Sequence, residues 1–130
     1  MTTHQQYTLG KEERLKSRKQ IERLFKEGQS FNSGILKVFH QLKEGSENIP
    51  LQFGVGVGTR HFKKAVDRNR IKRLVREACR LQKNELQSLL AAQNKQLNLF
   101  FIYTGKELPD YELVSEKTAA ALNKLMNIYK

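Results

Sequence analysis

The residues most able to do chemistry in this chain are positively charged and close together in the sequence. Between Arg60 and Lys83 there are ten Lys and Arg residues and two acids, Asp67 and Glu77, a net of +8 in a chain whose formal charge is +11. Such a segment suits phosphates, because each cation that contacts a phosphate releases condensed counterions. Arginine can also grip a phosphate or a base edge with two parallel hydrogen bonds. The segment therefore predicts a polyanionic partner, nucleic acid before an anionic membrane surface.

The acids, histidines and cysteine do not form a recognisable reaction centre. A protein-borne nuclease needs carboxylates that hold divalent metals, or a general base near the attacking oxygen. Asp67 and Glu77 stand alone among cations, and the three histidines are widely spaced, at positions 4, 40 and 61. The single Cys79 allows neither an internal disulfide nor a cysteine cluster for zinc. We therefore expect no catalytic residue and no metal site.

A long helix from Ala65 to about Leu90 would place these cations on one side. At about 100° per residue, with Asn69 as zero, five cations lie within about 60° of it. They form what we call the cationic face: Lys72, Arg73, Arg76, Arg80 and Lys83. The opposite side is apolar and would pack in the core: Ile71, Leu74, Val75 and Ala78. Most exposed helix faces mix signs, and like charges at i, i+4 repel; a nearly all-positive face therefore favours a binding surface over a merely solvated one.

The remaining elements must hold this helix in place. The pattern Ser17-x-x-Gln20 predicts the start of a short helix that Gly28 ends. Hydrophobic patterns further predict strands over 35–42, 51–58 and 97–103 and a last helix over 113–128, with a loop over 44–50. This order predicts an α+β sandwich in a single domain of 130 residues, with residues 1–10 flexible.

Two predicted strands raise specific expectations. In 51–58 one face alternates apolar residues while the other carries glycines 54, 56 and 58. Glycine weakens a strand unless something approaches its backbone closely, and a packed helix or a ligand would both explain the pattern. The continuous apolar run 97–103 predicts a strand buried on both faces. His40 lies on the apolar face of its strand, which predicts a structural role.

Composition and hydrophobic patterning indicate the cellular compartment of the protein. Apolar residues make up 38% of the sequence, enough for one core, and no apolar run approaches the length of a membrane span. The first residues contain no apolar run of the signal-peptide type. We expect a reduced, cytoplasmic setting.

The run 64–77, KAVDRNRIKRLVRE, resembles the signature of the bacterial ribonuclease P protein family, where an Arg-Asn-Arg core opens a basic helix. The resemblance continues through Arg14-Leu15-Lys16, Phe25-Lys26-Glu27-Gly28 and the strand from Phe53 to Val57, and covers roughly residues 10–129. It implies a two-layer sandwich, a four-stranded sheet packed by three helices in the order α-β-β-β-α-β-α. The crossover between parallel strands would be left-handed, as in a similar ribosomal protein domain.

The resemblance also implies two RNA-binding surfaces. By position, the basic helix would bind the catalytic RNA subunit through Arg68, Asn69, Arg70, Lys72, Arg73, Arg76 and Arg80. A cleft between the sheet and the first helix would bind the 5′ leader of precursor tRNA, with Phe25 and Phe39 as aromatic positions and Lys37 on the same face. An aromatic ring is a suitable platform for an unpaired base.

One loop departs from the family pattern. Many members carry lysines directly after the glycine strand, whereas this chain has Gly58-Thr59-Arg60-His61-Phe62 and is longer there by one residue. Arg60 and Lys63 would then substitute for those lysines at the leader cleft. His61, beside Arg60, could reach a phosphate.

The implied function is that of an accessory subunit of an endoribonuclease, with phosphodiester hydrolysis and Mg²⁺ on the RNA. The expected partners are the catalytic RNA and precursor tRNA, with no membrane and with a protein that is monomeric in isolation. The alternative is a structural ribosomal-type RNA-binding protein without a role in cleavage. A DNA-binding regulator is disfavoured, because no helix of suitable spacing precedes the basic one.

Overall fold

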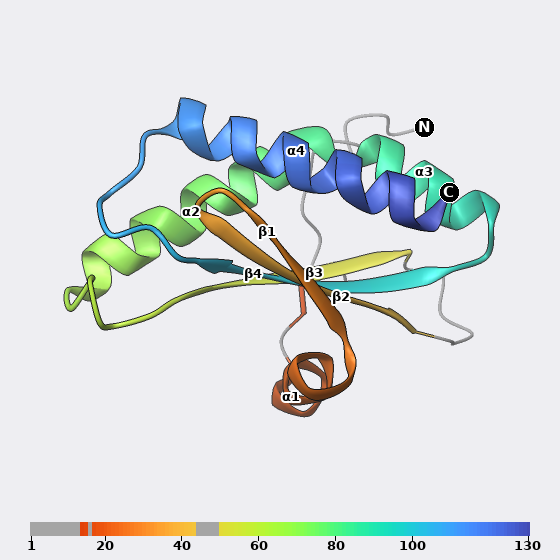
Figure 1. The fold of residues 1–130 in the computed structure, drawn as a ribbon, viewed down its shortest axis with the longest axis horizontal. Coiled ribbons are helices and arrows are strands. Elements are labelled where there is room, and N and C mark those ends of the chain that lie inside the picture. Colours follow the sequence, from red (N-terminus) through yellow and green to blue (C-terminus); the bar gives the residue numbers. More distant parts are fainter. Residues whose placement is uncertain (1–13, 16, 44–49) are drawn as a thin grey trace, which may run out of the picture.

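The computed structural model describes residues 14–15, 17–43 and 50–130 (Figure 1). The predicted flexible residues 1–10 and nearly all of the predicted loop 44–50 lie outside these ranges. The elements in chain order are α1 (Arg18–Glu27), β1 (Gln29–Ser33), β2 (Leu36–Lys43), β3 (Leu51–Val57), α2 (Ala65–Gln82), α3 (Asn84–Ala92), β4 (Gln96–Tyr103) and α4 (Tyr111–Tyr129).

The four strands form one mixed sheet in the order β1-β2-β4-β3. β1 and β4 both pair antiparallel with β2, and β3 runs parallel to β4. The parallel pair is joined through α2 and α3, which lie with α4 over one face of the sheet, whereas α1 lies alone on the other (Figure 1). The predicted α+β sandwich is thus confirmed.

The core lies between the sheet and the layer formed by α2, α3 and α4. Alternate residues of the three longer strands point into it, and all are buried: Leu36, Val38, Leu51, Phe53, Val55, Leu97, Leu99, Phe101 and Tyr103. α2 contributes Ile71, Val75 and Ala78, as its apolar pattern predicted, and α4 contributes Ala121, Leu122 and Leu125. This packing holds α2 in one orientation against the sheet.

The short helix α1 begins and ends where the sequence predicts. The hydroxyl of Ser17 accepts a hydrogen bond from the backbone N–H of Gln20 at 3.4 Å, and Gly28 follows the last turn. Leu24 is fully buried against the sheet. The backbone N–H of Leu15 donates to the carbonyl of Phe53 at 2.9 Å, so the segment before α1 adds to the outer edge of β3.

Two expectations differ from the structure. β4 is not buried on both faces: Phe100 and Ile102 are partly exposed, because ten-residue α1 covers only part of that face. The predicted helix 65–90 is interrupted at Lys83, where α2 ends and α3 begins. No helix in the described part of the chain is both long and apolar enough to cross a bilayer.

The expectation that His40 is structural is confirmed. Its side chain is 2% exposed, and its Nδ1 lies 2.5 Å from the hydroxyl oxygen of Tyr129 in α4. Burial and the charge of Lys124 lower the pKa of His40, while burial raises the pKa of Tyr129. Both shifts favour a neutral pair, in which the Tyr129 hydroxyl can donate to the imidazole.

We predict that this pair makes folding stability depend on pH. Because the folded-state pKa of His40 lies below the unfolded value of 6.5, the stabilisation is complete above about pH 6.5 and is lost as the pH falls through the folded pKa. Each unit of difference between the two pKa values corresponds to about 1.4 kcal/mol. Urea unfolding of wild type and His40→Gln between pH 7.5 and 5 should show a shallower loss in the variant. Equal slopes would contradict the prediction; His61→Gln, which removes an exposed histidine, is the control.

Candidate RNA interface

The solvent-facing side of α2 carries the cations that the sequence predicted. Asn69, Arg70 and Arg73 are exposed, and Lys72 and Arg76 are partly exposed. Directly opposite, Ile71 and Val75 are fully buried. The helix therefore presents positive charge outward from a fixed position.

Two predicted arginines on α2 have partners within the protein. Nη1 of Arg68 donates to the carbonyl oxygens of Phe62 and Lys63, both at 2.8 Å, and so holds the loop that precedes α2. Nε of Arg80 donates to Glu77 at 3.1 Å, and the two form an ion pair. This pair raises the pKa of Arg80 and lowers that of Glu77. Arg68 therefore also shapes the surface, and Arg80 is partly neutralised.

Lys83 does not belong to the cationic face, and the sequence-based placement is wrong. The residue is 1% exposed and follows the last residue of α2. The projection at 100° per residue holds only while the helix continues. Because the chain turns into α3 at this point, the side chain points inward.

Arg76 turns toward the opposite face of the sheet. Together with Arg14 it lines a hollow of about 330 Å³, whose other walls are Leu15, Ile21, Phe53, Gly54, Val55 and Phe100. Burial, and then the charge of Arg14, lower the pKa of Arg76. Two guanidinium groups thus face one hollow, and no acid is among the described residues that line it, a suitable environment for a phosphate group.

The structure brings Phe25 and Phe39 together, as the resemblance implied. Their ring centres are 4.7 Å apart, and Phe100 completes an aromatic cluster with its ring 5.3 Å from that of Phe25. Phe25 is 41% exposed. Nζ of Lys37 lies 5.1 Å from the centre of the Phe39 ring. A row of partly exposed rings with an adjacent cation can stack an unpaired base and attract its phosphate.

Phe100 also explains the glycines of β3. A Cβ atom at Gly54 or at Gly56 would lie 2.9 Å from the Phe100 ring. Neither a helix nor a ligand is therefore required, because a side chain of the neighbouring strand occupies the space above both glycines. This role of Phe100 could not be predicted, because the residue lies within a continuous apolar run.

Arg60 and Lys63 are not brought to the aromatic cluster. Arg60 and His61 line a separate hollow of about 190 Å³ at the carboxyl ends of β3 and β4, with Phe62 and Ile102 among its walls. Lys63 is exposed beside it. Ile102 is two residues beyond Phe100 on the same face of β4. This hollow therefore lies next to the aromatic cluster, farther toward the carboxyl end of β4.

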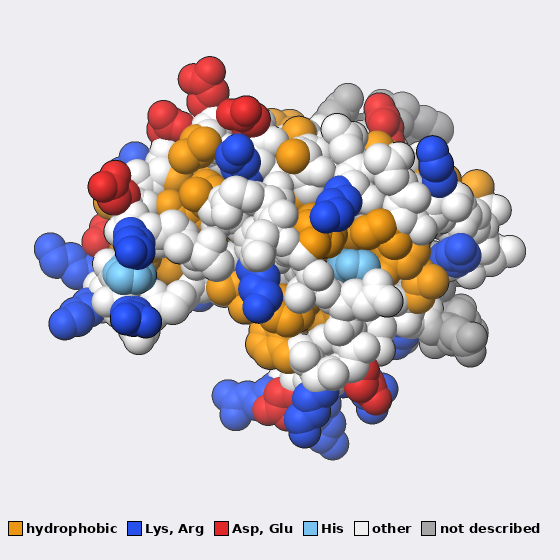
Figure 2. Space-filling model, viewed as in Figure 1, with side chains coloured by type: hydrophobic (Ala, Val, Ile, Leu, Met, Phe, Trp, Pro, Cys, Tyr) orange, Lys and Arg blue, Asp and Glu red, His pale blue; other side chains and the backbone are white. Residues whose placement is uncertain are grey.

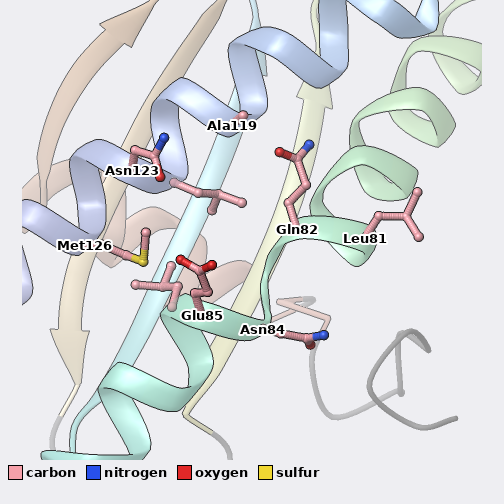
Figure 3. Close-up of a pocket in the computed structure, with 9 residues that line it drawn as sticks. Leu81, Gln82, Asn84, Glu85, Ala119, Asn123 and Met126 are labelled. Atoms are coloured by element: carbon pink, nitrogen blue, oxygen red, sulfur yellow. The ribbon is translucent and has the colours of Figure 1, made fainter.

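The helical side of the molecule offers a different kind of groove. Between the α2–α3 junction and α4 lies a hollow of about 320 Å³, where Gln82, Glu85, Asn123 and Met126 approach one another (Figure 3). Among the residues that the structure describes, neither Lys nor Arg lines it. Gln82 donates through Nε2 to the carbonyl oxygen of Ser115 at 3.2 Å. This groove lacks the charge that an RNA backbone needs.

Charge is distributed unevenly over the surface (Figure 2). Acidic side chains gather over the start of α4, where four carboxylates are exposed: Glu107, Asp110, Glu112 and Glu116. Apolar side chains appear where the lobe formed by α1 joins the body of the molecule (Figure 2). The start of α4 would repel RNA, whereas α2 and the α1 side of the sheet would attract it.

A basic helix fixed beside an aromatic, arginine-lined hollow on a mixed sheet defines a small RNA-binding α+β protein. A family model described as Ribonuclease P matches residues 9–126. The ribonuclease P protein component of Porphyromonas gingivalis is 34% identical over 125 residues, with 96% of this chain and 91% of that protein covered. That of Chlorobaculum tepidum is also 34% identical, with 82% and 75% covered. The chain belongs to the ribonuclease P protein family.

Solved structures agree with this family. The ribonuclease P protein of Thermotoga maritima superposes with a TM-score of 0.66 at 31% identity, with 86% of this chain and 96% of that chain covered. A Staphylococcus aureus ribonuclease P protein, at 18% identity, shares the fold with a TM-score of 0.65 and coverage of 91% and 98%.

Proposed function

We propose that this chain, as a protein component of bacterial ribonuclease P, binds the catalytic RNA through α2 and the 5′ leader of precursor tRNA through the aromatic cluster. It thereby assists the endonucleolytic 5′ maturation of tRNA. The protein works as a monomer that contributes phosphate neutralisation and base stacking, and the partner RNA contributes the bond cleavage.

The position of Arg76 carries this proposal. The residue belongs to α2, yet it lines the hollow that Phe100 walls on the other side of the sheet. In this proposal Arg76 links the exposed cations Arg70 and Arg73 of α2 to Phe100, a member of the aromatic cluster. An RNA bound on α2 and a single strand in the hollow would meet at Arg76, which can contact phosphates of either.

The hydrolytic chemistry is assigned to the RNA together with its Mg²⁺. Phosphodiester hydrolysis at a metal site requires oxygen ligands converging on the ion. In the parts of the chain that the structure describes, no group of three or more His, Cys, Asp or Glu could hold a metal ion.

Reconstitution with the cognate catalytic RNA tests the proposal as a whole. At low Mg²⁺, addition of the protein should accelerate removal of the leader, because its cations replace part of the counterion requirement of the RNA. A structural ribosomal-type protein would bind RNA without accelerating cleavage. An unchanged cleavage rate at saturating protein would reject the proposal in favour of that alternative.

On α2, Arg73→Ala should weaken binding of the catalytic RNA and reduce the slope of log K against log salt by about one charge. Arg73 is exposed and contributes nothing to the core, so folding should be unaffected. Filter binding across a salt series measures the slope. Lys106→Ala removes an exposed cation beside the acidic residues and should leave it unchanged. If both variants behave like wild type, α2 is not the contact surface.

In the aromatic cluster, Phe39→Ala should weaken the binding of precursor tRNA more than that of mature tRNA, since only the precursor carries a leader. Loss of one stacked base corresponds to about 1–3 kcal/mol, or roughly 5- to 150-fold in affinity. Affinities of the reconstituted holoenzyme for both RNAs measure the difference. Tyr111→Ala, which removes an exposed ring at the start of α4, serves as control. An equal loss for both RNAs would remove Phe39 from the leader site.

A further inference from the structure

A second recess lies on the α1 face of the sheet, on the other flank of the helix. α1 crosses the strands and is seen end-on in Figure 1. Its residue Leu24 faces the sheet, and Ile21 and Phe25 lie on the side of the helix that faces the aromatic cluster. The opposite flank carries Gln20, Arg23 and Glu27, which with Gln41, Leu42, Lys43 and Asn98 enclose about 320 Å³. We call this space the amide recess.

Side-chain amides form the floor of the amide recess, and Asn98 is the most buried of them. The residue is only 7% exposed and its side chain lines this recess. A side-chain amide in such a recess offers a donor and an acceptor to a ligand that enters it. Asn98 pairs in register with Gln41 on β2, so two amides stand side by side on the floor. Gln20 adds a third from α1.

The mouth of the amide recess is positively charged. Arg23 and Lys43 stand on opposite sides, from α1 and from β2. Glu27, the one acid among the described lining residues, lies 3.8 Å from Arg23 in an exposed ion pair, which is weak and easily exchanged. Leu42, which also lines the recess, is 40% exposed.

We propose that the amide recess binds one unpaired nucleobase of the RNA strand whose other bases stack on the aromatic cluster. Amide groups offer a donor and an acceptor side by side, which matches the edges of nucleobases. Arg23 or Lys43 contacts the phosphate of that nucleotide. This inference rests on the proposed function and adds a base-reading site to it.

The register of the sheet sets the distance between the aromatic cluster and the amide recess. Phe39 and Phe100 are paired in register on neighbouring strands, and Gln41 and Asn98 are the next pair on the same face. Two residues along a strand correspond to about 6.6 Å. Because α1 lies between the two sites, the RNA strand passes over or around this helix. The recess then receives a base beyond those that stack on the aromatic cluster.

Holoenzyme binding to precursor tRNAs with a single abasic nucleotide at successive leader positions tests this inference. In wild type, the abasic change at the position that reaches the amide recess should weaken binding about three- to tenfold, as expected for one or two lost hydrogen bonds. Asn98→Leu, which nearly preserves volume, should abolish the penalty at that position alone. Gln41→Leu, at a partly exposed position, gives the same test if Asn98→Leu folds poorly.

The outcomes separate this inference from the proposed function. Asn123→Leu changes an amide in the groove of Figure 3 and should keep the wild-type abasic profile. If Asn98→Leu and Gln41→Leu also keep it while Phe39→Ala still loses precursor binding selectively, the amide recess does not read a base and the leader site stands. If no leader position responds in wild type and Phe39→Ala has no selective effect, both proposals are overturned.

Discussion

The structure depends on the burial of one side of α2. Lys72, Arg76 and Arg80 follow one another at i, i+4, and each such pair of like charges destabilises a helix by about 0.2–0.5 kcal/mol. Full burial of Ile71 and Val75 contributes about 1.5–3 kcal/mol for each side chain. Hydrophobic packing therefore outweighs the repulsion several-fold. The cations stay together because the opposite side of the helix cannot leave the core, and a bound polyanion would relieve the remaining repulsion.

Periodicity was sufficient to predict the parts of the fold in which one face is buried. Most apolar positions of β2, β3, α2 and α4 face the core, and the cap of α1 at Ser17 is correct. The cations Arg70 and Arg73 are exposed for the same reason. β1, with the sequence QSFNS, has no alternating pattern. It forms because its backbone pairs with β2, and only the family resemblance indicated it.

The remaining features depend on contacts between residues far apart in the sequence. Phe100 was assigned to a buried run, yet its ring lies over Gly54 and Gly56 of the neighbouring strand. The helical projection of the sequence placed Lys83 on the cationic face, but Lys83 lies beyond the end of α2. The pairing of Arg68 with two loop carbonyls depends on where the chain turns before α2. Amino-acid types predicted the chemistry of the surface, whereas three-dimensional packing decides which groups remain available.

The modest anchoring of α1 has a dynamic consequence. Only Leu24 of its ten residues is buried, so this helix should detach from the sheet at a lower free energy than α2 or α4, as weakly packed segments do in local unfolding. Its backbone amides should exchange with solvent sooner than those of the core. An RNA strand bound on both sides of α1 would supply the contacts that the helix lacks. Helix docking and RNA binding are then thermodynamically linked, and each stabilises the other.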